Sequence, residues 1–521
     1  MPGADAEVAV LIVGGGPVGL TARALLARWG VPTLLVEKHT ALSPFPRSRL
    51  VNVRSMEIFR QLGLATRIEA NAFAPEYGRV RFRDTLYDPD FATAGMVGVD
   101  APVPESPVVG VVTSQDRLEP TLLAAADAEL RFGVELVDLT EEAEGVTAVL
   151  VDRRCGEKSR VRARYVLAAD GANSTVRERL GIGTTGPGVL AGFTTVVFDA
   201  DLGRWCADRP AGVYFTPHGT FGPVHPEGGW VWFHTTPEGA EDTEDADWAG
   251  VVSTALGSGA DVRVDVARVQ QWSMTAYVAD RLRRGRVLLA GDAAHAVPPI
   301  GGLGMNTGVA DAHNLCWKLA GVLQGWAGPG LLDSYQAERH PVARETLRQA
   351  VANSRLLLQV LNLRSEQLRT GAAASTPVEL PWSERYFAQL GLVLGMTYRS
   401  DAVLTDHGDP PGPSGTEYIP TAEPGRRMPH LWLTPDRSTL DAVGEWFTLL
   451  TPEPARWRQQ AAPPWPLRIE TLPDEPAVLH RLGPHGGALL VRPDGHVAAR
   501  WDGPPASGAT LRDALTAVTS R

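Results

Sequence analysis

The chain has 521 residues, a length that predicts roughly three domains with large apolar cores. Its net charge of −11 at pH 7 argues against a nucleic-acid partner, because an acidic chain repels phosphate backbones. No apolar run reaches the ~18 residues of a membrane-spanning helix, and no basic segment precedes an apolar stretch at the start. The three cysteines are far apart and form no metal-binding pattern, so we expect a cytoplasmic protein without membrane contact.

The first forty residues predict a strand, a turn, a helix and a second strand. The β-branched run at 8–13 is typical of a buried strand, and glycines follow it directly. The Ala- and Leu-rich residues 20–29 predict a helix that ends at Gly30, and residues 33–36 predict the second strand. This order of elements is typical of a unit that binds dinucleotides.

The turn between the first strand and the helix carries the pattern G-x-G-x-x-G. Gly14 suits the tight turn, Gly16 lets a pyrophosphate approach the backbone, and Gly19 lets the helix pack closely on the strand. The N-terminus of the helix offers free N–H groups to the phosphates. Glu37 follows Gly14 by about 20 positions and can accept hydrogen bonds from both hydroxyls of a ribose. This segment predicts a dinucleotide site but does not separate NAD from FAD.

Two later strands each end in an aspartate. Residues 165–169 precede Asp170-Gly171, and residues 286–290 precede Gly291-Asp292. In an open α/β sheet, ligands bind beyond the carboxyl ends of the strands. Taken singly, each motif is equally compatible with a capped turn.

Taken together and in this order, the three motifs resemble the single-component, FAD-dependent aromatic hydroxylases with the p-hydroxybenzoate hydroxylase fold. Softer matches place the chain nearest the branch that tailors aromatic polyketides, which includes the aklavinone hydroxylases. The resemblance implies an α/β protein with a Rossmann-like FAD-binding domain of the glutathione-reductase type, an inserted β-sheet substrate domain and a C-terminal thioredoxin-like domain. The expected boundaries are 1–180 and 279–395 for the two parts of the FAD domain, 181–278 for the substrate sheet, and 396–521 for a linker and the C-terminal domain.

The resemblance also implies where FAD binds. The ribityl chain would contact Asp292, Arg47 would face the pyrophosphate, and Gln115 would lie in a turn against the cofactor. The glycine-rich loop 298–308 would lie against the isoalloxazine ring at the start of a helix. The predicted cofactor-binding residues are Gly14, Gly16, Pro17, Val18, Gly19, Glu37, Lys38, Arg47, Gln115, Asp170, Gly171, Gly291, Asp292, Pro299, Gly302, Gly304, Met305 and Asn306, and no metal site is predicted.

The region between the two aspartate motifs is rich in β-branched and aromatic residues and predicts a sheet that covers one face of the flavin. Its aromatic side chains suit a pocket for an aromatic substrate, although an ordinary core role is the alternative for each of them. The predicted substrate-binding residues are Phe221, Trp230, Trp232, Trp272 and Met274.

The resemblance implies an FAD-dependent monooxygenase that binds FAD non-covalently, uses NADPH or NADH as a transient reductant and takes O2 as co-substrate. A hydroperoxide at flavin C4a would transfer a hydroxyl group to a polycyclic, polyketide-type phenol. Arg399 is the predicted catalytic residue, because a nearby cation lowers the pKa of a phenol; the alternative is an arginine that fixes the domain junction. The partner would be a small aromatic molecule, and the protein a monomer or a homodimer.

Three other functions fit the same motifs. Baeyer–Villiger oxygenation of a polyketide and oxidative inactivation of an aromatic antibiotic use the same scaffold. A non-catalytic FAD-binding partner in an oxygenase complex is the third alternative.

The C-terminal part predicts a small α/β unit. Residues 446–450 read as a strand, 488–501 as a hairpin around Pro-Asp-Gly, and 511–518 as a closing helix. No cysteine follows Cys316, which excludes thioredoxin chemistry there and favours a structural role.

Overall fold

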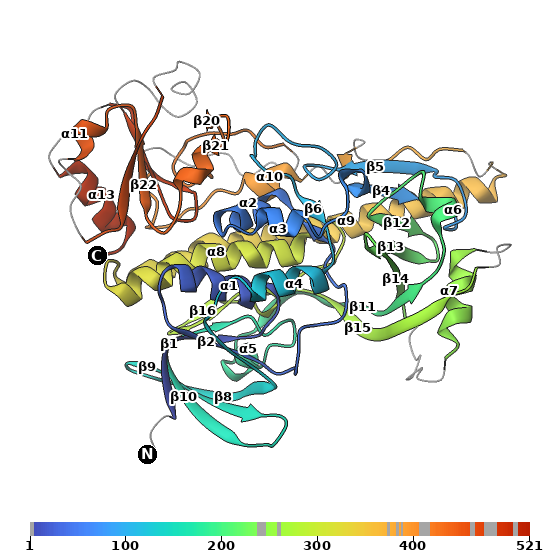
Figure 1. The fold of residues 1–521 in the computed structure, drawn as a ribbon, viewed down its shortest axis with the longest axis horizontal. Helices are drawn as coiled ribbons and strands as arrows, with labels where there is room; N and C mark the ends of the chain where they lie inside the picture. The colour runs from blue at the N-terminus through green and yellow to red at the C-terminus, as the bar shows by residue number, and fades with distance from the viewer. Residues whose placement is uncertain are drawn as a thin grey trace.

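The computed structural model describes residues 5–521 apart from 237–245, 258–261, 372, 374–375, 382–384, 387–388, 406–416, 459–463, 474–486 and 504–508. Figure 1 shows one sheet-containing unit below the long central helices, a second at the right, and a third, C-terminal unit at the upper left in orange and red. Among these described residues, no helix combines the length and apolar character needed to cross a membrane.

The first unit is built on a mainly parallel sheet. The β-branched run after residue 5 forms β1 (Ala6–Val13), which pairs in parallel with β2 (Thr33–Glu37) and with β10 (Lys158–Ala168). β17 (Val287–Leu289) pairs in parallel with β10, so both aspartate motifs follow neighbouring strands of one sheet. The remaining strands are β7 (Glu129–Phe132), β8 (Val134–Glu142), β9 (Gly145–Asp152) and β16 (Arg283–Arg284).

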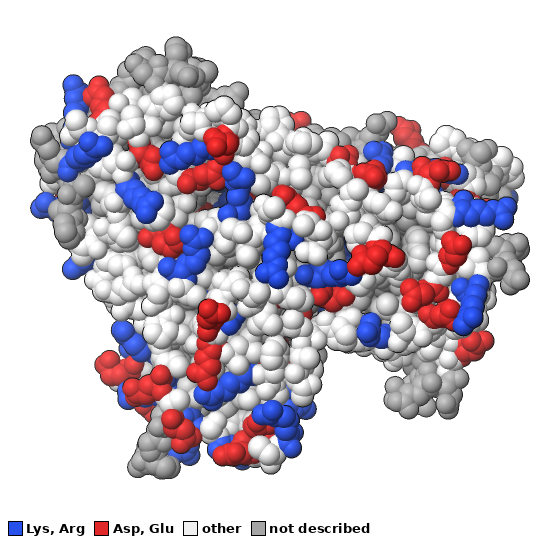
Figure 2. Space-filling model, viewed as in Figure 1, with Lys and Arg blue, Asp and Glu red and all other residues white. Residues whose placement is uncertain are grey.

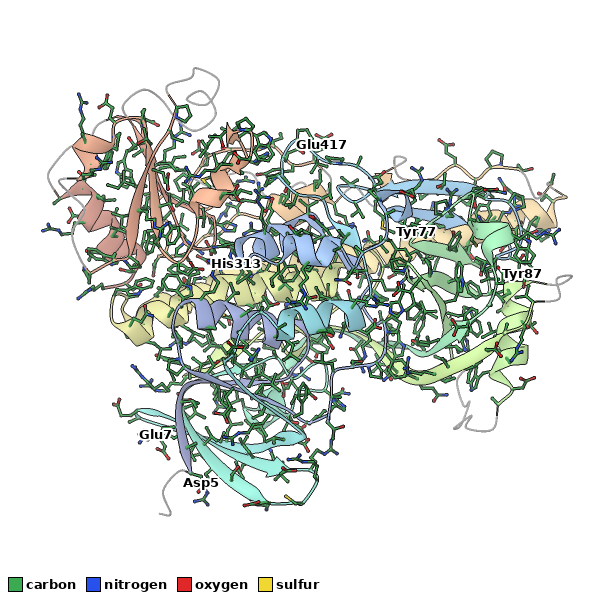
Figure 3. All side chains as sticks on the ribbon, in the orientation of Figure 1. Asp5, Glu7, Tyr77, Tyr87, His313 and Glu417 are labelled. Carbon is green, nitrogen blue, oxygen red and sulfur yellow. The ribbon has the colours of Figure 1, made fainter. Side chains whose placement is uncertain are left out.

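Long helices cover the first sheet and connect the three units. α1 (Pro17–Arg28) starts with proline at its first turn, as helices favour, and packs on α8 (Leu303–Gln324). His313 lies on α8 between α2 and the C-terminal unit (Figure 3), and its Nε2 shares a 2.7 Å hydrogen bond with Gln61 Oε1. The other helices around this sheet are α2 (Val53–Gln61), α3 (Ala65–Glu69), α4 (Gln115–Leu123), α5 (Thr175–Arg179), η2 (Gly291–Ala293), η3 (Pro329–Leu332) and α9 (Asp333–Arg369).

The second unit is a nine-stranded sheet, as predicted for the region between the aspartate motifs. Two long antiparallel strands, β11 (Thr184–Asp199) and β15 (Asp265–Ala279), extend from the first unit into it. Two of its strands come from before residue 181, because β4 (Arg79–Phe82) pairs with both β5 (Ala92–Met96) and β12 (Val213–Thr216). The remaining elements are η1 (Pro75–Tyr77), β13 (Gly219–His225), β14 (Gly228–Thr235), β18 (His295–Ala296), β19 (Arg385–Tyr386), α6 (Gly203–Cys206) and α7 (Trp248–Leu256), with a separate pair β3 (Leu50–Val51) and β6 (Val111–Val112) nearby.

The C-terminal unit contains a four-stranded sheet in the order β23-β22-β24-β25. β22 pairs in parallel with β23, whereas β24 is antiparallel to both of its neighbours. The predicted strand, hairpin and closing helix are all present, and part of the expected linker lies at 406–416, outside the described residues. The bounds are β22 (Phe447–Thr451), β23 (Leu467–Thr471), β24 (Ala488–Val491), β25 (Val497–Trp501), α11 (Pro454–Arg458) and α13 (Thr510–Val518), preceded by α10 (Leu390–Leu394), β20 (Trp432–Thr434), β21 (Arg437–Ser438) and η4 (Thr439–Ala442).

Candidate functional site

The glycine turn lies at the carboxyl end of β1 and leads directly into α1. Gly14 has φ +108°, and a Cβ there would collide with the carbonyl oxygen of Ala169 at the end of β10. A Cβ at Gly19 would collide with the carbonyl oxygen of Gly14, so the helix packs tightly on the turn. Gly16, in contrast, has no atom within 4 Å of a Cβ position. The open side of the turn therefore leaves its backbone accessible to a phosphate.

Glu37 lies beside this turn at the end of β2. Its Oε2 accepts a 2.7 Å hydrogen bond from the backbone N–H of Gly15, and its Oε1 accepts one of 2.8 Å from the N–H of His39. Lys38 follows and is half-buried. The structure thus brings the predicted ribose-binding carboxylate to the glycine turn.

The side chains of the two turn aspartates have different surroundings, because Asp170 is hydrogen-bonded within the protein and Asp292 is exposed. Asp170 accepts hydrogen bonds from Ser174 Oγ at 2.6 Å and from the N–H of Val176 at 3.0 Å, so it binds the first turn of α5 and its N-cap residue, Ser174. Asp292 remains open to solvent, although the surrounding protein raises its pKa. His295 and, to a smaller extent, Arg47 oppose that rise in the pKa of Asp292. The structure therefore brings Arg47 and Asp292, two predicted cofactor contacts far apart in the chain, into one site.

The turn at Gly291 is packed too closely for any larger residue. Gly291 has φ +60°, and a Cβ there would come 2.8 Å from Val18 Cγ2 on α1. A Cβ at Gly308 on α8 would come 2.9 Å from the Cα of Gly291. The glycines of the second aspartate motif and of the following loop thus let three segments meet around the predicted FAD site.

The loop before α8 is held by one buried amide. Asn306 Nδ2 donates to the carbonyl oxygens of Leu50 at 2.9 Å and Gly302 at 2.7 Å, and its Oδ1 accepts from the N–H of Asn52 at 2.9 Å. The predicted contacts Gly304 and Met305 are half-buried and Pro299 is exposed. Asn306 therefore fixes the loop rather than only lining it.

Glu119 is a buried carboxyl group that the sequence analysis did not select. Its Oε1 accepts a 2.7 Å hydrogen bond from Gln115 Nε2, and its Oε2 accepts one of 3.3 Å from the N–H of Ser43. Burial raises the pKa of Glu119 to about 7; Arg47 opposes the rise and Glu37 adds to it. Gln115 and Glu119 are four residues apart on α4, and this helical spacing is the sequence signal that predicts their contact.

We expect Glu119→Gln to remove a pH dependence of stability. A carboxyl group whose pKa is higher in the folded state stabilises the fold fully below its unfolded pKa, and this stabilisation is lost as the pH rises through about 7. The melting temperature of the wild type should therefore fall relative to that of Glu119→Gln between pH 5 and pH 8. If the melting temperatures of the two proteins changed equally between pH 5 and pH 8, the raised pKa of Glu119 would be contradicted.

Arg49 is a second site residue that the sequence analysis missed. It lies where the segment after Arg47 meets β13, donates from Nη2 to the carbonyl oxygen of Pro223, and occupies the space that a Cβ at Gly222 would need. Its Nε is buried without a hydrogen-bond partner, and no carboxylate among the described residues forms an ion pair with it. Burial lowers the pKa of Arg49 to about 10. A half-buried cation without a carboxylate partner among the described residues suits an anionic or phenolic ligand.

The five predicted substrate-binding residues lie on opposite faces of the second sheet. Phe221, Trp230 and Trp232 belong to the core that packs against α6 and α7. Trp272 stacks on Phe193, with ring centroids 5.1 Å apart, on the face that also carries Met274. This second face, called here the inner face, meets Phe45 of the first unit through Val197 and Val231. Of the five predicted residues, Trp272 and Met274 therefore lie on the inner face, which meets the first unit.

Arg399 is exposed, whereas its two neighbours point inwards. The hydroxyl of Tyr398 accepts a 3.0 Å hydrogen bond from Arg339 Nη1, and Ser400 Oγ donates to Glu338 Oε1 at 2.6 Å. The segment thus runs along α9 with Arg399 on its outer side.

Figure 2 shows acidic and basic side chains interspersed over the face in view. Within the described part of the chain, no group of three or more His, Cys, Asp or Glu side chains could hold a metal ion.

Comparison with known proteins accounts for most of the chain. Residues 7–350 match the family model for an FAD binding domain, and residues 421–521 match that for the C-terminal region of aromatic-ring hydroxylases. The chain is 38% identical over 487 residues to aklavinone 12-hydroxylase from Streptomyces peucetius, covering 89% of this chain and 95% of that protein.

Solved structures extend the similarity over the whole fold. The flavin-dependent monooxygenase PieE, solved with FAD and substrate, superposes with a TM-score of 0.89 at 34% identity and covers 99% of this chain and 100% of its own. A ternary complex of aklavinone-11 hydroxylase with FAD and aklavinone gives a TM-score of 0.86 at 34% identity, with both chains covered completely at 100%.

Proposed function

Because the chain belongs to the FAD-binding aromatic-ring hydroxylases, we propose that it hydroxylates a polycyclic, polyketide-type phenol with O2 and NADPH or NADH. The observation that carries the proposal is the meeting of the glycine turn, Arg47 and Asp292 at the carboxyl edge of the first sheet. When bound, FAD supplies the redox and oxygen chemistry, and the protein supplies binding, orientation and exclusion of water.

The residues around this edge fit FAD. The open backbone at Gly16 and the N-terminus of α1 would hold the pyrophosphate, with Arg47 facing it. Glu37 would exchange its bond to the Gly15 N–H for the ribose hydroxyls, and the accessible Asp292 carboxylate would accept from the ribityl chain. Asp170-Gly171, the loop residues Pro299 and Gly302, and Gly304 and Met305 in the first turn of α8 stay part of this proposal.

The substrate would lie between the flavin loop and the inner face of the second sheet. Trp272 and Met274 would form one wall of the pocket. For the cation that lowers the pKa of the phenol, Arg399 is the residue expected from the sequence, and the burial and missing counter-charge of Arg49 favour Arg49 as a second candidate.

Trp272→Ala and Phe221→Leu should separate the two faces of the sheet. We expect Trp272→Ala to raise the KM for the aromatic substrate by about tenfold, because one buried aromatic contact contributes about 1.5 kcal/mol. Phe221 lies in the core against α7, so Phe221→Leu should lower the melting temperature and leave KM unchanged. Steady-state kinetics and melting curves of both variants test which face of the sheet binds the substrate. If KM rose in Phe221→Leu alone, the substrate would bind on the face that carries Phe221.

The C-terminal unit fits a thioredoxin-like module. This interpretation is supported by its sheet order, by one parallel and two antiparallel pairings, and by α13 after the last strand. The chain has no cysteine beyond Cys316, so such a module would have no dithiol chemistry.

The purified protein tests the whole proposal. It should be yellow and release FAD on denaturation, and it should consume NADPH or NADH faster when a polycyclic phenol is added under air. Mass spectrometry of the product should show one added oxygen on an aromatic ring. A lactone product would instead support Baeyer–Villiger oxygenation, and a protein that takes up no FAD would overturn the proposal.

A further inference from the structure

The tight turn of residues 492–496 joins β24 to β25 and inserts between helices of the first unit. Asp494 is buried, and its Oδ2 accepts hydrogen bonds from Asn314 Nδ2 at 3.2 Å and from Trp317 Nε1 at 3.3 Å, both on α8. Its backbone carbonyl accepts a 2.8 Å bond from Arg54 Nη2 on α2. The C-terminal unit therefore contacts α2 and α8, and the first turn of α8 carries predicted FAD contacts.

A second set of contacts starts from the end of the same turn. The ring of His496 stacks on the ring of Tyr398, with centroids 4.0 Å apart. The Tyr398 hydroxyl accepts a 3.0 Å hydrogen bond from Arg339 Nη1 on α9. All three side chains are at least 94% buried, at 5%, 4% and 3% exposure respectively, so these contacts are shielded from water.

Arg339 carries the contacts on to the cofactor turns. Its Nε donates to Asp311 Oδ1 at 2.7 Å, and its Nη2 donates to the carbonyl oxygen of Thr307 at 3.1 Å, in the first turns of α8. Asp311 Oδ2 accepts from His295 Nε2 at 2.6 Å and from the backbone N–H of Gly291 at 3.1 Å. The contacts thus end on the backbone beside Asp292 and on the helix that follows the flavin loop.

We propose that the C-terminal unit is a positioning part of the cofactor site: turn 492–496 acts through Tyr398, Arg339 and Asp311 to hold the Gly291-Asp292 turn and the start of α8. The inference rests on the proposed placement of FAD at these turns. Tyr398 and His496 are positioning residues, since they reach the cofactor only through Arg339 and Asp311.

Tyr398→Phe tests the proposal, because it removes one hydroxyl group and keeps the ring that stacks on His496. Loss of one hydrogen bond to a charged group should weaken FAD binding roughly threefold to tenfold in a fluorescence titration of the deflavinated protein. The visible circular dichroism of the FAD-saturated variant should also differ from that of the wild type. His496→Leu should act in the same direction, and it carries the test if Tyr398→Phe does not fold.

Glu445→Gln is the matched control. Glu445 accepts hydrogen bonds from Arg28 at the far end of α1, so it joins the same two units without reaching Gly291. Its FAD dissociation constant should equal that of the wild type. Equal FAD binding in all four proteins, or equal weakening in the control, would overturn the positioning role. A wild-type protein that binds no FAD would overturn the proposed function, and the positioning role with it.

Discussion

Arg492→Met should lower the free energy of unfolding by about 3–5 kcal/mol, because it leaves a buried carboxylate without its counter-charge. Arg492 Nη2 donates to Glu338 Oε2 at 2.8 Å, and the same guanidinium pairs with Asp494. Lys318 Nζ donates to Glu338 at 2.7 Å, and all four side chains are at most 1% exposed. The four charges cancel, so removing Arg492 alone leaves one negative charge in the interior.

The pKa values of Glu338 and Lys318 also depend on the oppositely charged partners in this cluster. Burial raises the pKa of Glu338, but Arg492 and Lys318 outweigh burial and hold it well below its usual range. Burial lowers the pKa of Lys318 to about 8, although Glu338 opposes this. Each charge in the cluster is therefore tolerated only because its partners are present.

Urea denaturation of three variants checks this prediction. The double variant Arg492→Met/Asp494→Asn restores neutrality and should recover part of the lost stability. Arg28→Met removes an exposed ion pair with Glu445 between the same two units and should cost less than about 1 kcal/mol. If Arg492→Met lowered the free energy of unfolding no more than Arg28→Met does, the buried cluster would contribute little to stability.

Asp292→Ala should weaken FAD binding by about 10- to 100-fold, because a hydrogen bond to a charged group contributes about 1.5–3 kcal/mol. The Asp292 carboxylate is exposed, and its charge interacts with His295 and Arg47. The substitution therefore removes the proposed contact to the ribityl chain together with this charge. The measurement is the FAD content after gel filtration, followed by titration of the deflavinated protein. Asp292→Asn keeps one acceptor oxygen, so its affinity for FAD should lie between those of the wild type and Asp292→Ala.

Asp265→Ala is the control for this second prediction. Asp265 is an exposed carboxylate that pairs with Arg263 in the second sheet, far along the chain from the glycine turn. Its loss should leave the FAD content unchanged. An Asp292→Ala protein that retains FAD as well as Asp265→Ala does would exclude Asp292 as the ribityl contact.

Local patterns predicted the parts of the fold that depend on neighbouring residues. β1, α1 and β2 follow from an apolar run, a glycine turn and a helix of alanines and leucines, and all three are present. Strands β10 and β17 were predicted in the same way, each ending at its aspartate. These elements place the glycine turn and Asp292 at one edge of the sheet, so most of the candidate cofactor site could be read from the sequence.

The remaining features depend on pairings between distant segments. Phe221 and Trp272 are both aromatic residues on strands, but the register of the sheet puts them on opposite faces, and a shift of one residue would exchange those faces. The entry of β4 into the second sheet rests on its pairing with β12, more than a hundred residues later. Arg49 Nε is buried without a hydrogen-bond partner among the described residues. This is a property of the folded chain, so composition and spacing could not identify Arg49.

The parallel pairing of β1 with β10 and of β10 with β17 has a consequence for the order of events during synthesis. A ribosome-bound chain that has exposed only β1 and α1 carries the glycine turn, yet β10, one of the two strands that flank β1, is more than a hundred residues away. The close packing of Gly291 against Val18 and Gly308 can form only after α8 has emerged from the ribosome, because Gly308 lies on α8. Arg492 is translated later still, so of its two cationic partners Glu338 has only Lys318 until almost the entire polypeptide has left the ribosome. Non-local pairings of this kind fold slowly, and cofactor capture is therefore expected to be a late, essentially post-translational event.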